Sequence, residues 1–248
     1  MAHATKAATT SSVIGTAALI CAGLLGCGPS PAPEPAPAPG VATPVAGRQP
    51  VEADSLAVLP DVVAESALVE VRSLDPTILV ELRYATTHNF TGAVLPGYGA
   101  QRALLHREAA QALARVEARL RPDGLGLRIW DAYRPVRATA AMVAWAERVG
   151  RTDLLDQEYI ARRSRHNLGV AVDLTLVDLH SGTELDMGTP FDTFTEAAHT
   201  ANAAGVVQRN RQVLVRAMES EGFQNYENEW WHFSYPLADA RPFDLPIR

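Results

Sequence analysis

Ser164-Arg-His-Asn-Leu-Gly-Val-Ala-Val-Asp173 is the stretch around which the fold can be predicted, because it joins a histidine to a turn and to a strand that carries a carboxylate. Leu168 and Gly169 suit a tight turn, and the alternating residues 170–176 predict a strand. Asp173 lies on the face of this strand opposite to the aliphatic side chains. It therefore points either into solvent or into a metal site, and the alternation alone does not choose between them.

Glu229-Trp-Trp-His232, near the C-terminus, supplies a second histidine and a second carboxylate. His166, Asp173 and His232 have the number and type of ligands that a catalytic zinc ion takes, and Glu229 is then free to act as a base. Residues three apart share a face on a helix but point oppositely on a regular strand. A bulge or a local turn is therefore needed to aim Glu229 and His232 into one site.

The composition is that of an ordinary globular protein, with 248 residues, 47% of them hydrophobic, and a net charge of -6. The sequence has no basic stripe, so we expect no nucleic-acid partner, and nothing in it indicates an obligate protein partner. Both cysteines, Cys21 and Cys27, lie in the first 27 residues. A metal site in the folded region must therefore use nitrogen and oxygen ligands.

Residues 1–26 are predicted to be a lipoprotein signal peptide. Their apolar segment, residues 13–25, has the length of a signal-peptide core and is short for a membrane span, which needs about 20 residues. Leu24-Leu-Gly-Cys27 resembles a bacterial lipobox, in which cleavage exposes the cysteine for lipid attachment. We expect lipidation of Cys27 and export to the bacterial cell envelope, facing the periplasm or the outside. In a simple secretory signal, Cys27 would be incidental.

Residues 27–65 are predicted to form a disordered tether between that anchor and a catalytic domain at residues 66–248. The segment from Gly28 to Pro50 holds eight prolines spaced among alanines, a composition that favours extended polyproline II and buries little apolar surface. An untethered disordered tail would have the same composition. The remaining chain is long enough to bury a core of its own.

The folded region alternates between predicted strands and helices. Beyond the strand at residues 170–176, we expect strands at residues 77–84, 125–130 and 229–235, and helices at residues 101–120, 136–149, 153–159 and 206–221. The loop at residues 185–192 carries two carboxylates, Asp186 and Asp192, either of which could meet a substrate amine.

Arg134 closes the turn Asp131-Ala-Tyr-Arg134 at the end of a predicted strand. It is either a fixed cation at the strand end or half of a surface pair with Asp131 worth less than about 1 kcal/mol, and the spacing leaves both readings open. Metal-assisted hydrolysis needs a base for the attacking water and a cation for the anionic intermediate. Glu229 and Arg134 are our candidates for these two roles.

Five motifs resemble, in the same order, those of the VanX-type D-alanyl-D-alanine dipeptidases of the zinc D,D-peptidase family. The motifs cover nearly all of residues 70–235: Tyr84-Ala-Thr-Thr-His-Asn-Phe-Thr-Gly92, Trp130-Asp-Ala-Tyr-Arg-Pro135, residues 164–176, Leu185-Asp-Met-Gly188 and Glu229-Trp-Trp-His-Phe233. That family also holds VanY-like carboxypeptidases and shares its fold with the Hedgehog signalling domain. The resemblance implies an α+β fold with a central, mainly antiparallel sheet flanked by helices.

By this resemblance, His166, Asp173 and His232 fall on the family's ligands for one zinc ion, Glu229 falls on its catalytic base, and Arg134 falls on its transition-state-stabilising arginine. Further residues match motif positions near the substrate pocket: Tyr84, Ser164 and Asp186.

The implied activity is zinc-dependent hydrolysis of D-alanyl-D-alanine in a closed cavity that recognises both ends of the dipeptide. Two alternatives stay open: a VanY-like carboxypeptidase that trims peptidoglycan stem peptides, and a wall-binding lipoprotein that keeps the metal site only as structure. The best-known dipeptidases of this type are cytoplasmic, so the predicted export departs from them. Export favours a role in the salvage of wall-derived dipeptides.

Overall fold

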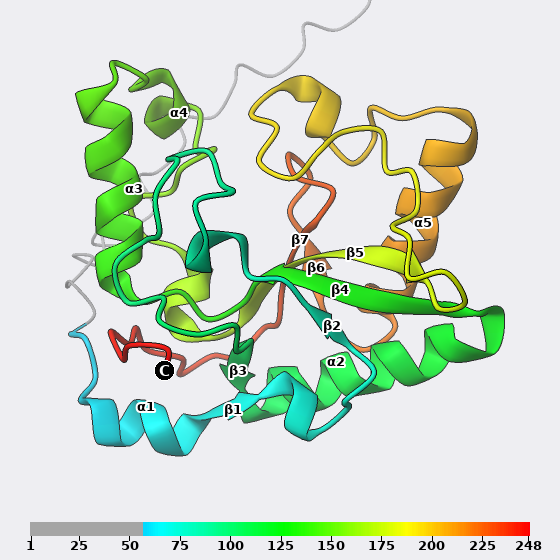
Figure 1. Cartoon of the computed structure of the whole chain (residues 1–248), viewed down its shortest axis with the longest axis horizontal. Coiled ribbons are helices and arrows are strands. Elements are labelled where there is room, and N and C mark those ends of the chain that lie inside the picture. Colours follow the sequence, from blue (N-terminus) through cyan, green and yellow to red (C-terminus); the bar gives the residue numbers. More distant parts are fainter. Residues whose placement is uncertain (1–56) are drawn as a thin grey trace, which may run out of the picture. The chain divides into compact units, whose positions relative to one another are not determined.

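The structure, a computed structural model, describes residues 57–248 and contains a five-stranded sheet in the order β2-β4-β5-β7-β6. Only the β2–β4 pair is parallel, so the predicted α+β fold with a mainly antiparallel sheet is confirmed. Figure 1 shows this sheet and, beside it, the antiparallel pair β1–β3. The strands are β1 (Leu68–Glu70), β2 (Leu79–Val80), β3 (Leu104–His106), β4 (Leu125–Asp131), β5 (Ala171–Asp178), β6 (Gln224–Asn225) and β7 (His232–Ser234).

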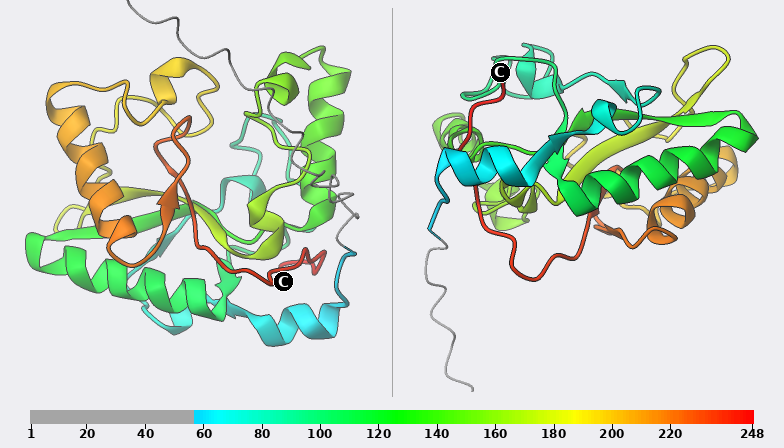
Figure 2. Two further views of the ribbon diagram at one scale, coloured as in Figure 1. Left: turned by 180° about the vertical axis from the view of Figure 1, so that it is seen from behind. Right: turned by 90° about the horizontal axis from the view of Figure 1, so that it is seen from below.

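Two long helices cover the sheet and contact each other, and Figure 2 shows them from two sides. These are α2 and α5; α2 also packs on β4, and α5 on β5. The helices are α1 (Asp61–Ala67), α2 (Arg107–Leu120), α3 (Val136–Arg148), α4 (Asp153–Asp156) and α5 (Gly205–Glu219). Among residues 57–248, no helix combines the length and the apolar character needed to cross a membrane.

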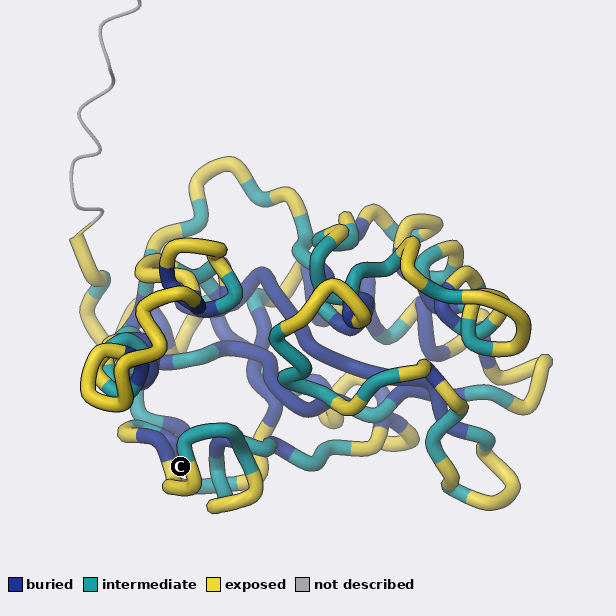
Figure 3. Tube along the Cα trace, turned by 90° about the horizontal axis from the view of Figure 1, so that it is seen from above, coloured by how far each residue is buried: buried dark blue, intermediate teal, exposed yellow. Residues whose placement is uncertain are grey.

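The two central strands, β4 and β5, form the middle of the core, which Figure 3 shows as buried backbone. Aliphatic side chains such as Ile129 and Leu174 are fully buried on one face of these strands. The other face of β5 is also covered, because Asp173 is only 3% exposed and Thr175 only 1%. The solvent reading of Asp173 is therefore wrong, and its carboxylate needs polar or charged partners inside the protein.

Two predicted strands are shorter than their sequence patterns indicate. The strand predicted at residues 77–84 pairs with β4 only at Leu79–Val80. The N–H of Glu81 still donates to the Ile129 carbonyl, but the N–H of Leu82 donates to the Gln101 side chain, which takes the chain out of the sheet. The strand predicted at residues 229–235 is confined to β7, because a turn occupies its first residues.

Helices were predicted in the right places but with different ends. The helix predicted at residues 101–120 begins at Arg107, since Leu104–His106 pairs with β1 instead. Tertiary pairing overrides the helical pattern there. The helix predicted at residues 153–159 ends at Asp156, and the helix predicted at residues 136–149 is α3, which ends at Arg148.

The folded domain begins before the predicted boundary at residue 66. Leu59 forms a bridge with Phe243, and the N–H of Leu59 donates to the Pro242 carbonyl. Ala64 on α1 is buried in the core. The end of the predicted tether, from Leu59 onward, therefore belongs to the domain. The predicted signal peptide, the Cys27 lipidation site and the tether up to residue 56 lie outside the described residues.

The core contains a fully buried carboxyl group, that of Glu117 on α2. Its Oε2 accepts from the N–H of Leu127, and its Oε1 lies 3.0 Å from the Thr77 hydroxyl. Burial raises the pKa of Glu117, although its hydrogen bonds oppose the rise. Because the folded-state pKa is raised, this group's contribution to stability is complete below its unfolded-state pKa and is lost as the pH rises through the folded-state value.

We therefore expect Glu117→Gln to gain stability relative to the wild type as the pH is raised from 4 to 8, because a neutral amide can keep both hydrogen bonds. Urea unfolding at several pH values measures this difference in free energy. Glu117→Leu leaves the Leu127 N–H unpaired and should cost about 1–3 kcal/mol. A free-energy difference between the glutamine variant and the wild type that does not change with pH would contradict the assignment.

Candidate active site

A cavity of about 350 Å³ contains most of the residues singled out in the sequence. One wall comes from Met142 of α3, and the opposite wall comes from Asp192 and Phe194 in the loop that follows β5. Figure 1 shows α3 and this loop, drawn in yellow, on either side of the strands that carry the charged residues. The volume is within the range of small-ligand sites, roughly 300–1,000 Å³.

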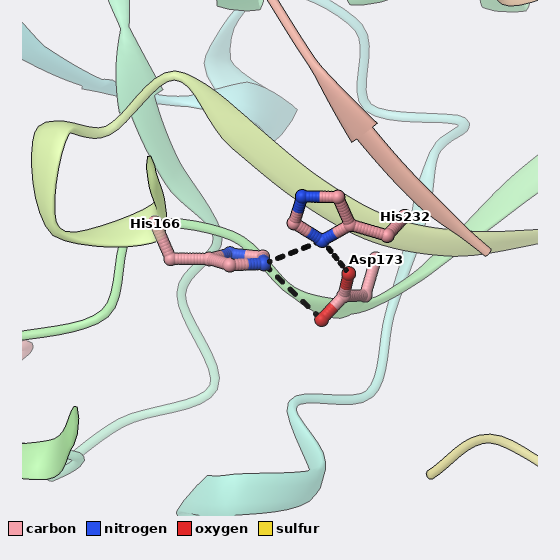
Figure 4. Close-up of side chains that lie close together, drawn as sticks. All are labelled: His166, Asp173 and His232. Carbon is pink, nitrogen blue, oxygen red and sulfur yellow. Dashed lines mark hydrogen bonds and ion pairs between the residues drawn. The ribbon is translucent and has the colours of Figure 1, made fainter. Parts of the chain in front are cut away.

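His166, Asp173 and His232 line this cavity, and Figure 4 shows their side chains pointing toward one another. The Nδ1 atom of His232 lies 2.9 Å from Oδ1 of Asp173, and the Nε2 atom of His166 lies 3.3 Å from Oδ2 of the same carboxylate. The two histidine nitrogens are 3.1 Å apart. Three potential ligand atoms therefore converge on one point.

Different elements bring these ligands together. Asp173 and His232 are direct partners in the antiparallel β5–β7 ladder. His166 lies in the short 3-10 helix η4 (Arg165–Leu168), whose N-cap Ser164 accepts the N–H of His166. Gly169 ends this helix in a left-handed conformation, which glycine adopts without strain, and the chain then enters β5. Ser164, predicted near the substrate, thus lines the cavity and also caps the helix.

The free nitrogens of the two histidines have the chemistry of metal ligands. The Nδ1 atom of His166 lies 2.6 Å from the Ala132 carbonyl, so an N–H there donates to it and leaves the Nε2 lone pair facing Asp173. Burial lowers the pKa of His232, which favours the neutral ring that a metal requires. Burial alone would raise the pKa of Asp173, but the two histidines outweigh it and hold that pKa well below its ordinary value.

Glu229 reaches the same point because a turn precedes β7. The N–H of His232 donates to the Glu229 carbonyl at 3.1 Å, and this turn brings the Glu229 carboxylate within 3.9 Å of the His232 ring. The local turn that the spacing required is therefore present. Burial raises the pKa of Glu229 well above its ordinary value, and the nearby Asp173 and Asp192 add to the rise while Arg134 opposes it. A carboxyl with a raised pKa suits the transfer of protons near neutral pH.

Arg134 enters the cavity beside the metal ligands. Its guanidinium forms an ion pair with Asp131 at 2.7 Å and lies 3.8 Å from Asp173. The Asp131 side chain is 0% exposed and that of Arg134 11%, so the pair is buried rather than superficial. Asp131 also accepts from the Tyr98 hydroxyl and lies 3.5 Å from the His166 ring. The buried Asp131 carboxylate therefore orients the Arg134 guanidinium and also lies next to the metal-ligand candidate His166. The spacing of Asp131 and Arg134 in the sequence did not reveal this.

Of the two carboxylates in the loop at residues 185–192, Asp192 lines the cavity. The Tyr84 hydroxyl donates to it at 2.9 Å, and removal from solvent raises the pKa of Asp192 to about 8. Asp192 has a positive φ of 60°, a strained backbone conformation that is common at functional sites. Asp186 is exposed and accepts from the N–H of Gly188, so the structure places it outside the cavity lining.

The donor set fits a metal ion. Two imidazole nitrogens and one carboxylate oxygen lie within 4.8 Å of one another, and catalytic zinc takes three such protein ligands and keeps one position open. The Ala132 carbonyl behind His166 supplies the outer partner that metal-bound histidines need. His166, Asp173 and His232 are therefore a candidate metal site.

We expect zinc to raise the melting temperature of the wild type and not of His232→Ala or Asp173→Ala. Zinc at a hundred times its Kd would stabilise the folded wild type by about 2.7 kcal/mol. Thermal unfolding with and without zinc, together with the bound-metal content, measures this effect. His180→Ala, at an exposed histidine outside the triad, is the matched control. Equal zinc stabilisation in all four proteins would place the metal elsewhere.

Comparison with known proteins agrees with this arrangement. The model of peptidase family M15, described as D-ala-D-ala dipeptidase, matches residues 64–244. The chain belongs to the M15 peptidase family. A D-alanyl-D-alanine dipeptidase of Escherichia coli strain K12 is 38% identical to it over 180 residues, which cover 71% of this chain and 88% of that protein. A D-alanyl-D-alanine dipeptidase of Enterococcus faecium is 35% identical over 188 residues, which cover 68% and 92%.

Among solved structures, the vancomycin resistance D,D-dipeptidase VanXYg, in complex with a D-Ala-D-Ala phosphinate analog, aligns with this M15 peptidase at a TM-score of 0.36 and 19% identity. The alignment covers 68% of this chain and 66% of that one. Membership in a metallopeptidase family makes the protein an enzyme.

Several cavity residues of this M15 peptidase carried no signal in the sequence. Aromatic rings from separate segments line the cavity, and isolated aromatic residues such as these have no periodic pattern that could reveal them: Tyr159, Phe194 and Tyr226. Asp131 entered the sequence analysis only as the partner of Arg134 in a surface pair, and the tertiary structure shows that this pair is buried.

Proposed function

We propose that this M15 peptidase uses zinc to hydrolyse D-alanyl-D-alanine and related D,D-dipeptides to free amino acids. The observation that carries this proposal is the Asp192 carboxylate, which shares one small cavity with the candidate metal site and with Glu229. A carboxylate held by the Tyr84 hydroxyl suits a free ammonium group. A dipeptide has such a group next to its scissile bond, whereas a stem peptide has an amide there.

The side chains divide the chemistry between them. When bound, zinc would lower the pKa of a coordinated water towards about 7 and polarise the substrate carbonyl. Glu229 would take the proton from the attacking water and deliver it to the leaving amine. Arg134, fixed by Asp131, would stabilise the negative charge that develops on the carbonyl oxygen. Asp192 would be ionised in the complex, since a metal ion and a substrate ammonium both favour its charged form.

The test compares three substrates with the zinc-loaded full chain: D-Ala-D-Ala, its N-acetyl derivative and a pentapeptide ending in D-Ala-D-Ala. Release of D-alanine should be fastest from the free dipeptide, and Asp192→Asn should raise its KM. A marked preference for the pentapeptide would overturn the dipeptidase assignment in favour of a carboxypeptidase. Peptidoglycan binding without turnover of any of the three substrates would support the wall-binding alternative.

We also propose that the enzyme is exported and held in the cell envelope by lipid on Cys27, where it would release D-amino acids from wall-derived dipeptides. The lipobox-like Leu24-Leu-Gly-Cys27 and the proline-rich segment after it support this. Cells that express the full chain should incorporate labelled palmitate into it, and Cys27→Ala should remove the label. Equal labelling of the two proteins would contradict the anchor.

A further inference from the structure

Arg211, on α5 (Gly205–Glu219), is a buried cation that donates to the main chain instead of to a carboxylate. Only 2% of the surface of Arg211 is exposed to solvent. The guanidinium donates from Nε to the Met187 carbonyl at 2.8 Å, from NH1 to the His199 carbonyl at 2.7 Å and from NH2 to the Ala197 carbonyl at 3.1 Å. Burying a charged side chain costs free energy unless the charge is well paired. A buried arginine whose guanidinium is hydrogen-bonded to three carbonyls therefore indicates a specific role.

These three carbonyls lie at the two ends of the loop that carries Asp192. Met187 precedes Asp192, and Ala197 and His199 follow it, so one planar guanidinium joins both ends. The neighbouring Asn210 adds a fourth tie, because its side-chain amide donates to the Asp186 carbonyl at 2.8 Å. The loop also packs closely on α5: a Cβ added to Gly188 would come within 2.7 Å of Val207.

The loop needs such a restraint because Asp192 is strained. A non-glycine residue with a positive φ carries backbone strain, which contacts that fix the surrounding chain can offset. The Tyr84 hydroxyl holds the Asp192 carboxylate, but it does not hold the backbone. The Arg211 guanidinium, in contrast, is bonded to main-chain carbonyls at both ends of the loop.

The same cation is coupled to the turn that carries Glu229. The guanidinium carbon of Arg211 lies 5.8 Å from the centroid of the Trp230 ring. Trp230 in turn donates from its main-chain N–H to the Ala198 carbonyl at 3.0 Å and from its indole N–H to the Thr189 hydroxyl at 2.8 Å. The loop at residues 187–199 is therefore held between α5 and the Glu229 turn.

We propose that Arg211 is a positioning residue that sets the place of Asp192 and thereby the recognition of the substrate amine. The inference rests on the proposed function, since it assumes that Asp192 binds the ammonium group. The hydrogen bonds of Arg211 go to the loop and its aromatic contact goes to Trp230, and none of them involves His166, Asp173 or His232. Removing the guanidinium should therefore disturb substrate binding and leave metal binding intact.

The test uses Arg211→Met and the milder Arg211→Lys in the zinc-loaded full chain. A displacement of about 1 Å at a reacting site can cost roughly a hundredfold, so kcat/KM for D-Ala-D-Ala should fall by about that factor in the methionine variant. Most of the loss should appear as a raised KM, because the ammonium contact is made in the bound substrate as well as in the transition state. Lysine keeps the charge but loses the fork of donors, so it should show a smaller effect in the same direction.

A double-mutant cycle separates positioning from general destabilisation. In an Asp192→Asn background, Arg211→Met should change kcat/KM by no more than about twofold, because the residue through which it acts is already impaired. Glu117→Leu, at a buried carboxyl that lines neither wall of the cavity, is the control for lost stability and should leave KM unchanged. Losses that multiply in the double variant, or an unchanged KM in Arg211→Met, would overturn the inference.

Hydrogen exchange distinguishes failure of the inference from failure of the proposed function. The amides of residues 188–196 should exchange faster in Arg211→Met than in Glu117→Leu, whether or not the dipeptide is the substrate. If the wild type does not hydrolyse D-Ala-D-Ala, the proposed function fails. If exchange in this loop is the same in both variants, Arg211 does not restrain the loop and the inference fails.

Discussion

Replacing Glu229 with glutamine is expected to abolish turnover of D-Ala-D-Ala while the protein still binds zinc. The amide keeps the size of the side chain but cannot accept the proton of the attacking water, and a positioned general base contributes roughly 10²- to 10⁴-fold to the rate. The metal ligands should remain in place, because the turn that positions His232 uses the main-chain carbonyl of Glu229, which the substitution keeps. Steady-state kinetics and the bound-zinc content measure the two effects separately.

Glu227→Gln is the matched control, since Glu227 is an exposed carboxylate two residues away. It should retain the activity of the wild type. If Glu229→Gln and Glu227→Gln turn over the dipeptide at the same rate, Glu229 is not the base. A glutamine variant that loses zinc along with activity would instead assign Glu229 to the metal site.

Replacing Arg134 is expected to give the second large loss, about 10²- to 10³-fold in kcat, because the developing oxyanion loses its fixed cation. Arg134→Lys is the better variant for kinetics. Arg134→Met also leaves Asp131 buried without its cation, which typically costs about 3–5 kcal/mol in stability. Lysine keeps a charge next to Asp131 but cannot reproduce the planar fork, so it should fold and remain slow.

Kinetics on D-Ala-D-Ala, with thermal unfolding measured in parallel, tests this prediction. The control is Arg137→Met, at a surface arginine of α3 that pairs with Asp244 outside the cavity. It should leave kcat unchanged. A lysine variant at position 134 with wild-type kcat would show that Arg134 serves only to neutralise Asp131 and Asp173.

Much of the architecture could be read from local patterns. The helical spacing of Leu105, Ala109, Leu113, Val116 and Leu120 indicates one buried helix face, which all of them but Leu105 form on α2, and the alternation after Gly169 predicted β5. These patterns succeed because each depends only on residues a few positions apart. The order of five motifs also indicated the family, which the match over residues 64–244 shows.

The ends of elements and the choice between similar residues could not be read in the same way. Leu104–His106 looks like the start of a helix and becomes a strand because β1, far away in the sequence, offers its edge. Asp186 and Asp192 have the same chemistry in one loop, and only the path of that loop over α5 brings Asp192 into the cavity.

The sequence by itself determined which residue types were available for the site: two histidines and two carboxylates in two short motifs, with an arginine at a strand end. Tertiary structure alone decided that they meet. The β5–β7 register sets Asp173 beside His232, and the turn before β7 brings Glu229 to the same point. Burial of the Asp131–Arg134 ion pair then fixes the orientation of the Arg134 guanidinium. Spacing along a chain restricts local geometry, but burial and proximity depend on partners distant in sequence.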